Sequence, residues 1–251
     1  MLSDAIFYQN GIQPSAIEKP LVYILGATLI VLCLLFIKAR RGITTYRADL
    51  AWLRAGIYFC VALLISKFTG VLSTLLQTPV VTEAQLSNWL WWAFTGFWVL
   101  QVFIAYTFIW PRGTFTEGRK LEPIPITFFG IMWGLCHAQM FLVVWALVEY
   151  TGLGTLWVAI ISFNVISFLN LQWQLRFWDV HISPQHNIEE WNNKKVLMCH
   201  VPNLLLGFIH LALFGNIAIF VALQTYALMV SAINMHFPAW WDKTAGQTQE
   251  S

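Results

Sequence analysis

The sequence predicts an all-α integral membrane protein, a polytopic bundle of about seven transmembrane helices. Hydrophobic residues make up 58% of the 251 positions and charged residues only 10%, whereas soluble domains contain roughly 45–50% and 25%. A soluble core of this size cannot bury so much apolar surface. Long apolar stretches alternate with short polar loops, and basic residues concentrate in every second loop. The net charge of +2, without a basic run that carries aromatic residues, gives no indication of a nucleic-acid partner.

The apolar stretches define one transmembrane domain, residues 1–237, followed by a polar C-terminal tail at 238–251. Residues 196–237 would measure about 60 Å as a single helix, twice the hydrocarbon thickness of a bilayer. We therefore expect two spans joined near Gly215 and Asn216, with one long tilted helix as the alternative. The expected spans lie near residues 21–37, 51–76, 89–110, 124–149, 154–175, 197–214 and 217–236.

The residues that flank the spans support these boundaries. The first span ends at the basic residue Lys38, and the third has tryptophan at both ends, at Trp89 and Trp110. Tryptophan is enriched where a helix crosses the membrane–water interface. The fourth span ends at Glu149, and a tight turn at residues 151–154 leads into the fifth.

The loops predict the orientation of the bundle. Basic residues crowd residues 38–50, 111–123 and 176–195, and they are absent from 78–87 and 151–154. The positive-inside rule then places the N-terminus outside and the loop at 176–195 in the cytoplasm. The membrane would be a bacterial inner membrane or a eukaryotic endomembrane. Without a cleavable signal peptide, the first span is expected to direct insertion.

Residues 174–203 carry the side chains most suited to chemistry. Three of the six histidines and three of the twelve acidic residues fall in these thirty positions. Imidazole and carboxylate groups are common ligands of iron, copper and zinc. The set would hold such an ion if the loop folds back on the start of the sixth span, although its spacing differs from the known HxxxH and HExxH motifs. The candidate ligands, which are also the first candidates for catalysis, are Asp179, His181, His186 and His200.

The same residues could work without a metal ion. A carboxyl group near a low-dielectric wall, at Asp179 or Glu149, would keep its proton and could donate it to an isoprenoid. Aromatic residues, 16% of the chain, would stabilise the carbocations of the cyclisation that follows.

Polar residues inside the spans are expected to orient a substrate. Steps of three, three and four residues place Asn164, Ser167, Asn170 and Gln174 on one face of the fifth span. The alternative for this face is hydrogen bonding between helices, worth about 0.6–2 kcal/mol per contact. The substrate-orienting candidates are His137, Asn170, Gln174, Asn203 and His210.

These observations favour a membrane enzyme that acts on a lipid or isoprenoid-like substrate by cyclisation or oxidation, near the cytoplasmic face. The expected partners are membrane lipids and an apolar small molecule, and the oligomeric state stays open. One alternative is a non-catalytic or electron-transfer membrane subunit, with a b-type haem between His137 and His210. Another is a transporter, for which Lys67 in the second span is the main argument.

Overall fold

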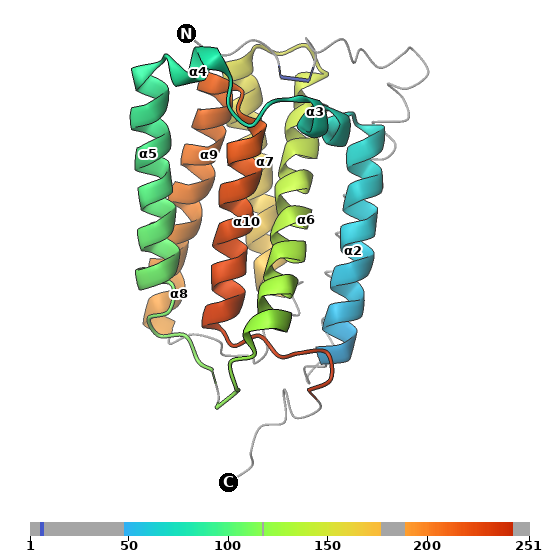
Figure 1. The fold of residues 1–251 in the computed structure, drawn as a ribbon, viewed down its shortest axis with the longest axis vertical. Helices are drawn as coiled ribbons and strands as arrows, with labels where there is room; N and C mark the ends of the chain where they lie inside the picture. The colour runs from blue at the N-terminus through green and yellow to red at the C-terminus, as the bar shows by residue number, and fades with distance from the viewer. Residues whose placement is uncertain (1–5, 8–47, 117, 177–188, 243–251) are drawn as a thin grey trace.

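The computed structural model is a bundle of helices that stand side by side (Figure 1). It describes residues 6–7, 48–116, 118–176 and 189–242. The helical elements in these ranges are α2 (Ala48–Phe68), α3 (Val71–Gln77), α4 (Glu83–Leu86), α5 (Trp89–Ile104), η2 (Ala105–Ile109), α6 (Pro123–Glu149), α7 (Thr155–Arg176), α8 (Glu189–Lys195), η3 (Val196–His200), α9 (Val201–Phe214) and α10 (Ile217–Asn234).

Five of the described helical segments are long and apolar enough to cross a membrane. They are Ala48–Phe68, Trp89–Ile109, Pro123–Glu149, Val196–Phe214 and Ile217–Asn234. The helix α7, 22 residues long, overlaps the expected fifth span over residues 155–175. The first expected span, 21–37, lies outside the described residues. The all-helical class is therefore confirmed for the described residues, and the number of seven spans stays a prediction.

The helix α6 forms the centre of the bundle, and its closest contact is with α10. Gly130 and Gly134 lie one turn apart on the face of α6 that meets α10. A Cβ atom on Gly130 would lie 2.6 Å from the Cα of Met229, and one on Gly134 would lie 2.6 Å from the Cα of Thr225. The two backbones therefore touch, which only glycine at these positions allows.

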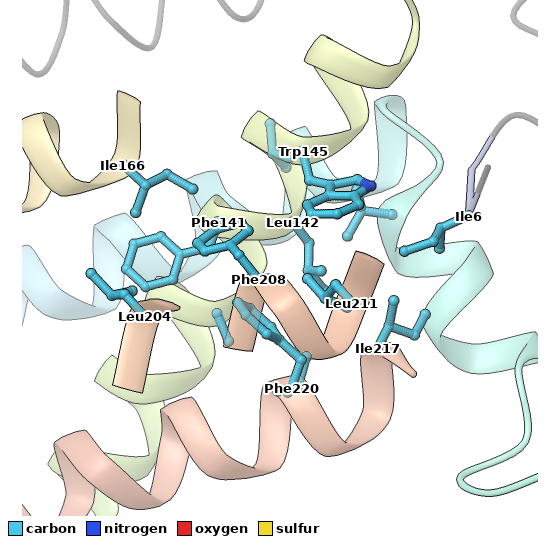
Figure 2. Packing of buried hydrophobic residues seen from close by; sticks show 14 of the residues in the cluster. Ile6, Phe141, Leu142, Trp145, Ile166, Leu204, Phe208, Leu211, Ile217 and Phe220 are labelled. Atoms are coloured by element: carbon cyan, nitrogen blue, oxygen red, sulfur yellow. The ribbon is translucent and has the colours of Figure 1, made fainter. Parts of the chain in front are cut away.

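Aromatic rings from α6, α9 and α10 pack against one another in the core (Figure 2). Trp145 of α6 stacks on Phe208 of α9, with 5.8 Å between the ring centroids. Phe208 in turn packs edge to face with Phe220 of α10, with 5.6 Å between the ring centroids. These three side chains are almost completely buried, and burial of each large apolar side chain contributes about 1.5–3 kcal/mol. They fix α9 against both α6 and α10.

The chain turns between α9 and α10 at Gly215 and Asn216, where the sequence predicts two separate spans. Gly215 adopts a φ of +62°, which ends α9. The Asn216 side chain caps α10 by accepting a hydrogen bond from the Ile219 amide at 3.0 Å. Its amide group donates to the Val80 carbonyl at 3.0 Å, so the turn is attached to the loop that precedes α4.

Basic residues gather at the other end of the bundle. The ammonium group of Lys195 donates to the hydroxyl of Thr114, which joins the start of η3 to the loop that follows η2. The guanidinium group of Arg119 donates to the carbonyls of Met235 and His236 beyond α10, at 3.0 and 3.2 Å. Two of the basic loops found in the sequence therefore meet at this end, which we call the basic end.

The close contact at Gly134 predicts that two glycine-to-alanine substitutions differ in their effect on stability. Gly134→Ala should lower the free energy of unfolding by about 1–3 kcal/mol, because the new methyl group has to push α10 away from α6. Gly96→Ala, on an exposed face of α5 with no atom within 4 Å of the new Cβ, should be neutral or stabilising by about 0.5–1 kcal/mol. Thermal unfolding of both purified variants in detergent would measure the difference. Equal stability of the two variants would contradict the close contact.

Candidate functional site

Two π-helical turns, η2 and η3, pack against each other near the basic end. The thiol of Cys199 in η3 donates to the Ala105 carbonyl in η2, at 3.4 Å. π-helical turns are rare, and they occur frequently at functional sites. We name the place where they meet the π-turn site. Its side chains are Tyr106, Trp110, Lys195, Cys199 and His200.

A proline explains why the backbone departs from regular α-helix at η3. Pro202 has no N–H group, so it cannot donate to the carbonyl of Met198, four residues earlier. The side-chain amide of Gln101, from α5, donates to this carbonyl at 3.3 Å instead. In η2, the amide of Asn234 donates to the Tyr106 carbonyl at 2.9 Å. Side chains from neighbouring helices therefore supply the donors for carbonyls in both turns.

The buried imidazole of His200 lies at the centre of the π-turn site. Its Nδ1 atom is 3.2 Å from the hydroxyl of Tyr106. Its ring and that of Trp110 are nearly perpendicular, with 4.7 Å between the centroids. A hydroxyl and an imidazole in contact, away from water, can exchange a proton with a substrate. The contact at Nδ1 leaves Nε2 as the His200 atom that would face a metal ion.

A row of hydrogen bonds continues from this site into the bundle. The indole N–H of Trp98 donates to Oδ1 of Asn203 at 3.0 Å, and Nδ2 of Asn203 donates to Oε1 of Gln224 at 3.0 Å. All three residues are buried. Their bonds are the interhelical kind that stabilises membrane bundles. Asn203 is therefore held in one orientation by partners on α5 and α10.

Lys195 is a site residue that the sequence does not reveal. Acidic residues followed by lysines at residues 189–195 predict a short exposed helix with ion pairs between residues four positions apart. Glu190 and Lys194 form such a pair. Lys195 is one position further, about 100° around the helix. Its side chain is buried, with the ammonium group 5.2 Å from the ring centroid of Trp110. Burial lowers the pKa of Lys195 to about 8.

His137 and His200 lie at about the same depth of the bundle. The stacked pair Trp145 and Phe208 sets the register of α6 against α9, which run in the same direction. His137 lies eight residues before Trp145, and His200 lies eight residues before Phe208. Eight residues of helix span about 12 Å. His137 is buried in α6, and its ring lies 5.4 Å from that of Phe141.

His210 lies about 15 Å further along the bundle than His137, by the same counting of residues. Its Nε2 atom is 2.9 Å from the hydroxyl of Thr95, and its ring lies 5.2 Å from that of Trp98. Two axial ligands of one haem iron must face each other across a single atom. The structure does not bring His137 and His210 together in this way.

Glu149 is the last residue of α6, and this end of α6 lies at the opposite end of the bundle from α8 (Figure 1). Its carboxylate accepts a hydrogen bond from the Phe7 amide at 2.9 Å. The structure therefore does not bring Glu149 together with His200, and the sequence contains no signal for its partner at the N-terminus.

The helix α7 also differs from the expected arrangement at Asn164, the first residue of its expected polar face. Asn164 is exposed on the bundle surface, and its amide group donates to the Ile160 carbonyl of its own helix at 2.8 Å. Asn170 and Gln174 lie further along α7, where side chains fall outside the described residues.

Asp179, His181 and His186 lie outside the described residues. Within the ranges that are described, no group of three or more His, Cys, Asp or Glu side chains is placed to hold a metal ion. His200 is the one member of the expected ligand set whose position is visible. Comparisons of the chain with protein-family models, curated proteins and solved structures found no match.

The burial of Lys195 predicts a pH dependence of stability. A lysine pKa of about 8 in the folded state, against about 10.4 in the unfolded chain, means that the unfolded chain binds more protons between these values. The stability of the protein should therefore rise with pH over this window, relative to Lys195→Met. The melting temperatures of both proteins in detergent from pH 7 to pH 10.5 would show the gain. A constant difference across that range would contradict a buried, neutralised amine.

Proposed function

We propose that the protein is an integral membrane enzyme that acts on a lipid or isoprenoid-like substrate at the π-turn site. The observation that carries this proposal is the pair of π-helical turns, which hold an imidazole, a phenol and an amine among tryptophan rings at one end of an apolar bundle. The basic end of the bundle would face the cytoplasm, since five basic residues lie in its loops and in α8, namely Arg112, Arg119, Lys120, Lys194 and Lys195.

The side chains of the site suit proton transfer to or from an apolar molecule. Tyr106 and His200 would act as a donor–acceptor pair, and the low pKa of Lys195 would let its amine take or give a proton near neutral pH. The faces of Trp98 and Trp110 would stabilise a cation that forms on the substrate. Asn203 would orient a polar group of the substrate, together with Asn170 and Gln174.

The residues that join α7 to α8 would complete the site. Asp179, His181 and His186 lie within 21 positions of His200 in the sequence, and they would supply an acid, a base or metal ligands. If iron, copper or zinc is bound, Nε2 of His200 would be one ligand. The chemistry of an imidazole–carboxylate set fits these ions.

Two tyrosine variants test whether the π-turn site is the reacting site. Tyr106→Phe removes the hydroxyl that contacts His200, whereas Tyr226→Phe removes one that contacts Thr107, at 3.2 Å. We expect the first to lower activity by about 10²–10⁴-fold, as loss of a general acid or base does, and the second to leave it within a few fold. Lipid extracts from cells that express each protein would be compared by untargeted mass spectrometry. Loss of the product signal in both variants, or in neither, would count against this site.

Metal analysis distinguishes the two chemical versions of the proposal. Near-stoichiometric iron, copper or zinc in the purified protein, lost on His200→Ala at unchanged yield of folded protein, would select the metal-assisted reaction. A metal-free protein that still forms product would select acid–base chemistry.

A further inference from the structure

An indole ring holds two basic side chains together at the basic end. The guanidinium carbon of Arg112 lies 6.0 Å from the ring centroid of Trp191, and the ammonium nitrogen of Lys194 lies 5.0 Å from the same centroid. Arg112 belongs to the loop after η2, and the other two residues belong to α8. We call this group of three residues the Trp191 corner.

The backbone of the loop fixes the position of the ring. Gly113 has a φ of +66°, and a Cβ atom on it would lie 2.5 Å from Cδ1 of Trp191. The indole therefore lies directly on the loop backbone, where any other residue would displace it. This contact sets the separation of Arg112 and Lys194, which come from segments about 80 residues apart in the sequence.

The Trp191 corner carries an excess of positive charge. Lys194 pairs with Glu190, but no carboxylate pairs with Arg112 among the residues that the structure describes. Lys195, the next residue of α8, is buried against Trp110 and does not belong to the corner. Cations gathered in this way repel one another unless a negative charge joins them, so the corner is complementary to an anion.

We propose that the Trp191 corner binds the phosphate group of an anionic phospholipid. A guanidinium fork and an ammonium group are the usual ligands of phosphate, and tryptophan favours the depth of the lipid headgroups. This inference relies on the membrane location proposed above, and it is independent of the reaction at the π-turn site. The lipid would be a bound partner of the protein, with its acyl chains along the apolar surface of the bundle.

Charge-neutral substitutions at the corner test the inference. The full-length protein would be extracted from membranes, and its melting temperature measured with vesicle lipid added as pure phosphatidylcholine or as a mixture with phosphatidylglycerol. Phosphatidylglycerol should raise the melting temperature of the wild type. The double variant Arg112→Gln/Lys194→Gln should bind it about thirtyfold more weakly, from about 1 kcal/mol for each basic residue near the surface. Lys67→Gln/Lys120→Gln loses the same charge from two exposed positions outside the corner. It should bind phosphatidylglycerol at most about fivefold more weakly, since only Lys120 lies at the basic end.

The outcomes distinguish a phospholipid bound at the Trp191 corner from other causes of the change in melting temperature. An equal response of both double variants, or no response of the wild type, would overturn the proposed site. A full response to inorganic phosphate at the same concentration would show a free anion as the ligand and overturn the lipid assignment. If the double variant does not fold, Lys194→Gln alone, at an exposed position, should still weaken binding about fivefold. Recovery of the wild type outside the membrane fraction would instead refute the proposed membrane location.

Discussion

The contact between α6 and α10 is the constraint on which the rest of the bundle depends. In a lipid environment no hydrophobic force draws apolar helices together, so close packing and hydrogen bonds have to do so. Gly130 and Gly134 let the two backbones touch. Once α10 lies against α6, its other faces reach α9 and η2, where Gln224 and Asn234 form their hydrogen bonds. The glycine contact therefore places the polar groups of the site as well as the core.

The second constraint is that every backbone N–H and C=O group in an apolar region needs a hydrogen-bond partner. Two π-helical turns break the regular pattern, and each has a carbonyl that receives a donor from another helix, Gln101 in one case and Asn234 in the other. Such an arrangement stabilises a local geometry that an α-helix cannot provide. As a result, Tyr106 from one π-helical turn and His200 from the other lie in hydrogen-bond contact. This contact is the basis of the proposed chemistry.

The sequence predicts the helices well because apolar length and turn residues are local properties. The break between α9 and α10 follows from a stretch too long for one span and from Gly215 and Asn216 within it. The residues of the site depend on contacts between helices, which periodicity does not reveal. A polar face of α7 is visible in the sequence, yet Asn164 bonds its own backbone. Lys195 is hidden because the pattern of ion pairs identifies only the exposed side of α8.

The short helix α8 connects the two proposed sites. Lys194 and Lys195 are adjacent in the sequence and point to different surroundings, since consecutive residues of a helix differ by about 100°. The first contacts Trp191 at the surface, and the second contacts Trp110 inside. Because α8 continues directly into η3, a phosphate bound at the Trp191 corner would fix the start of the turn that carries His200. A lipid at the surface would thereby hold the Lys195 amine and the His200 imidazole in register with Tyr106.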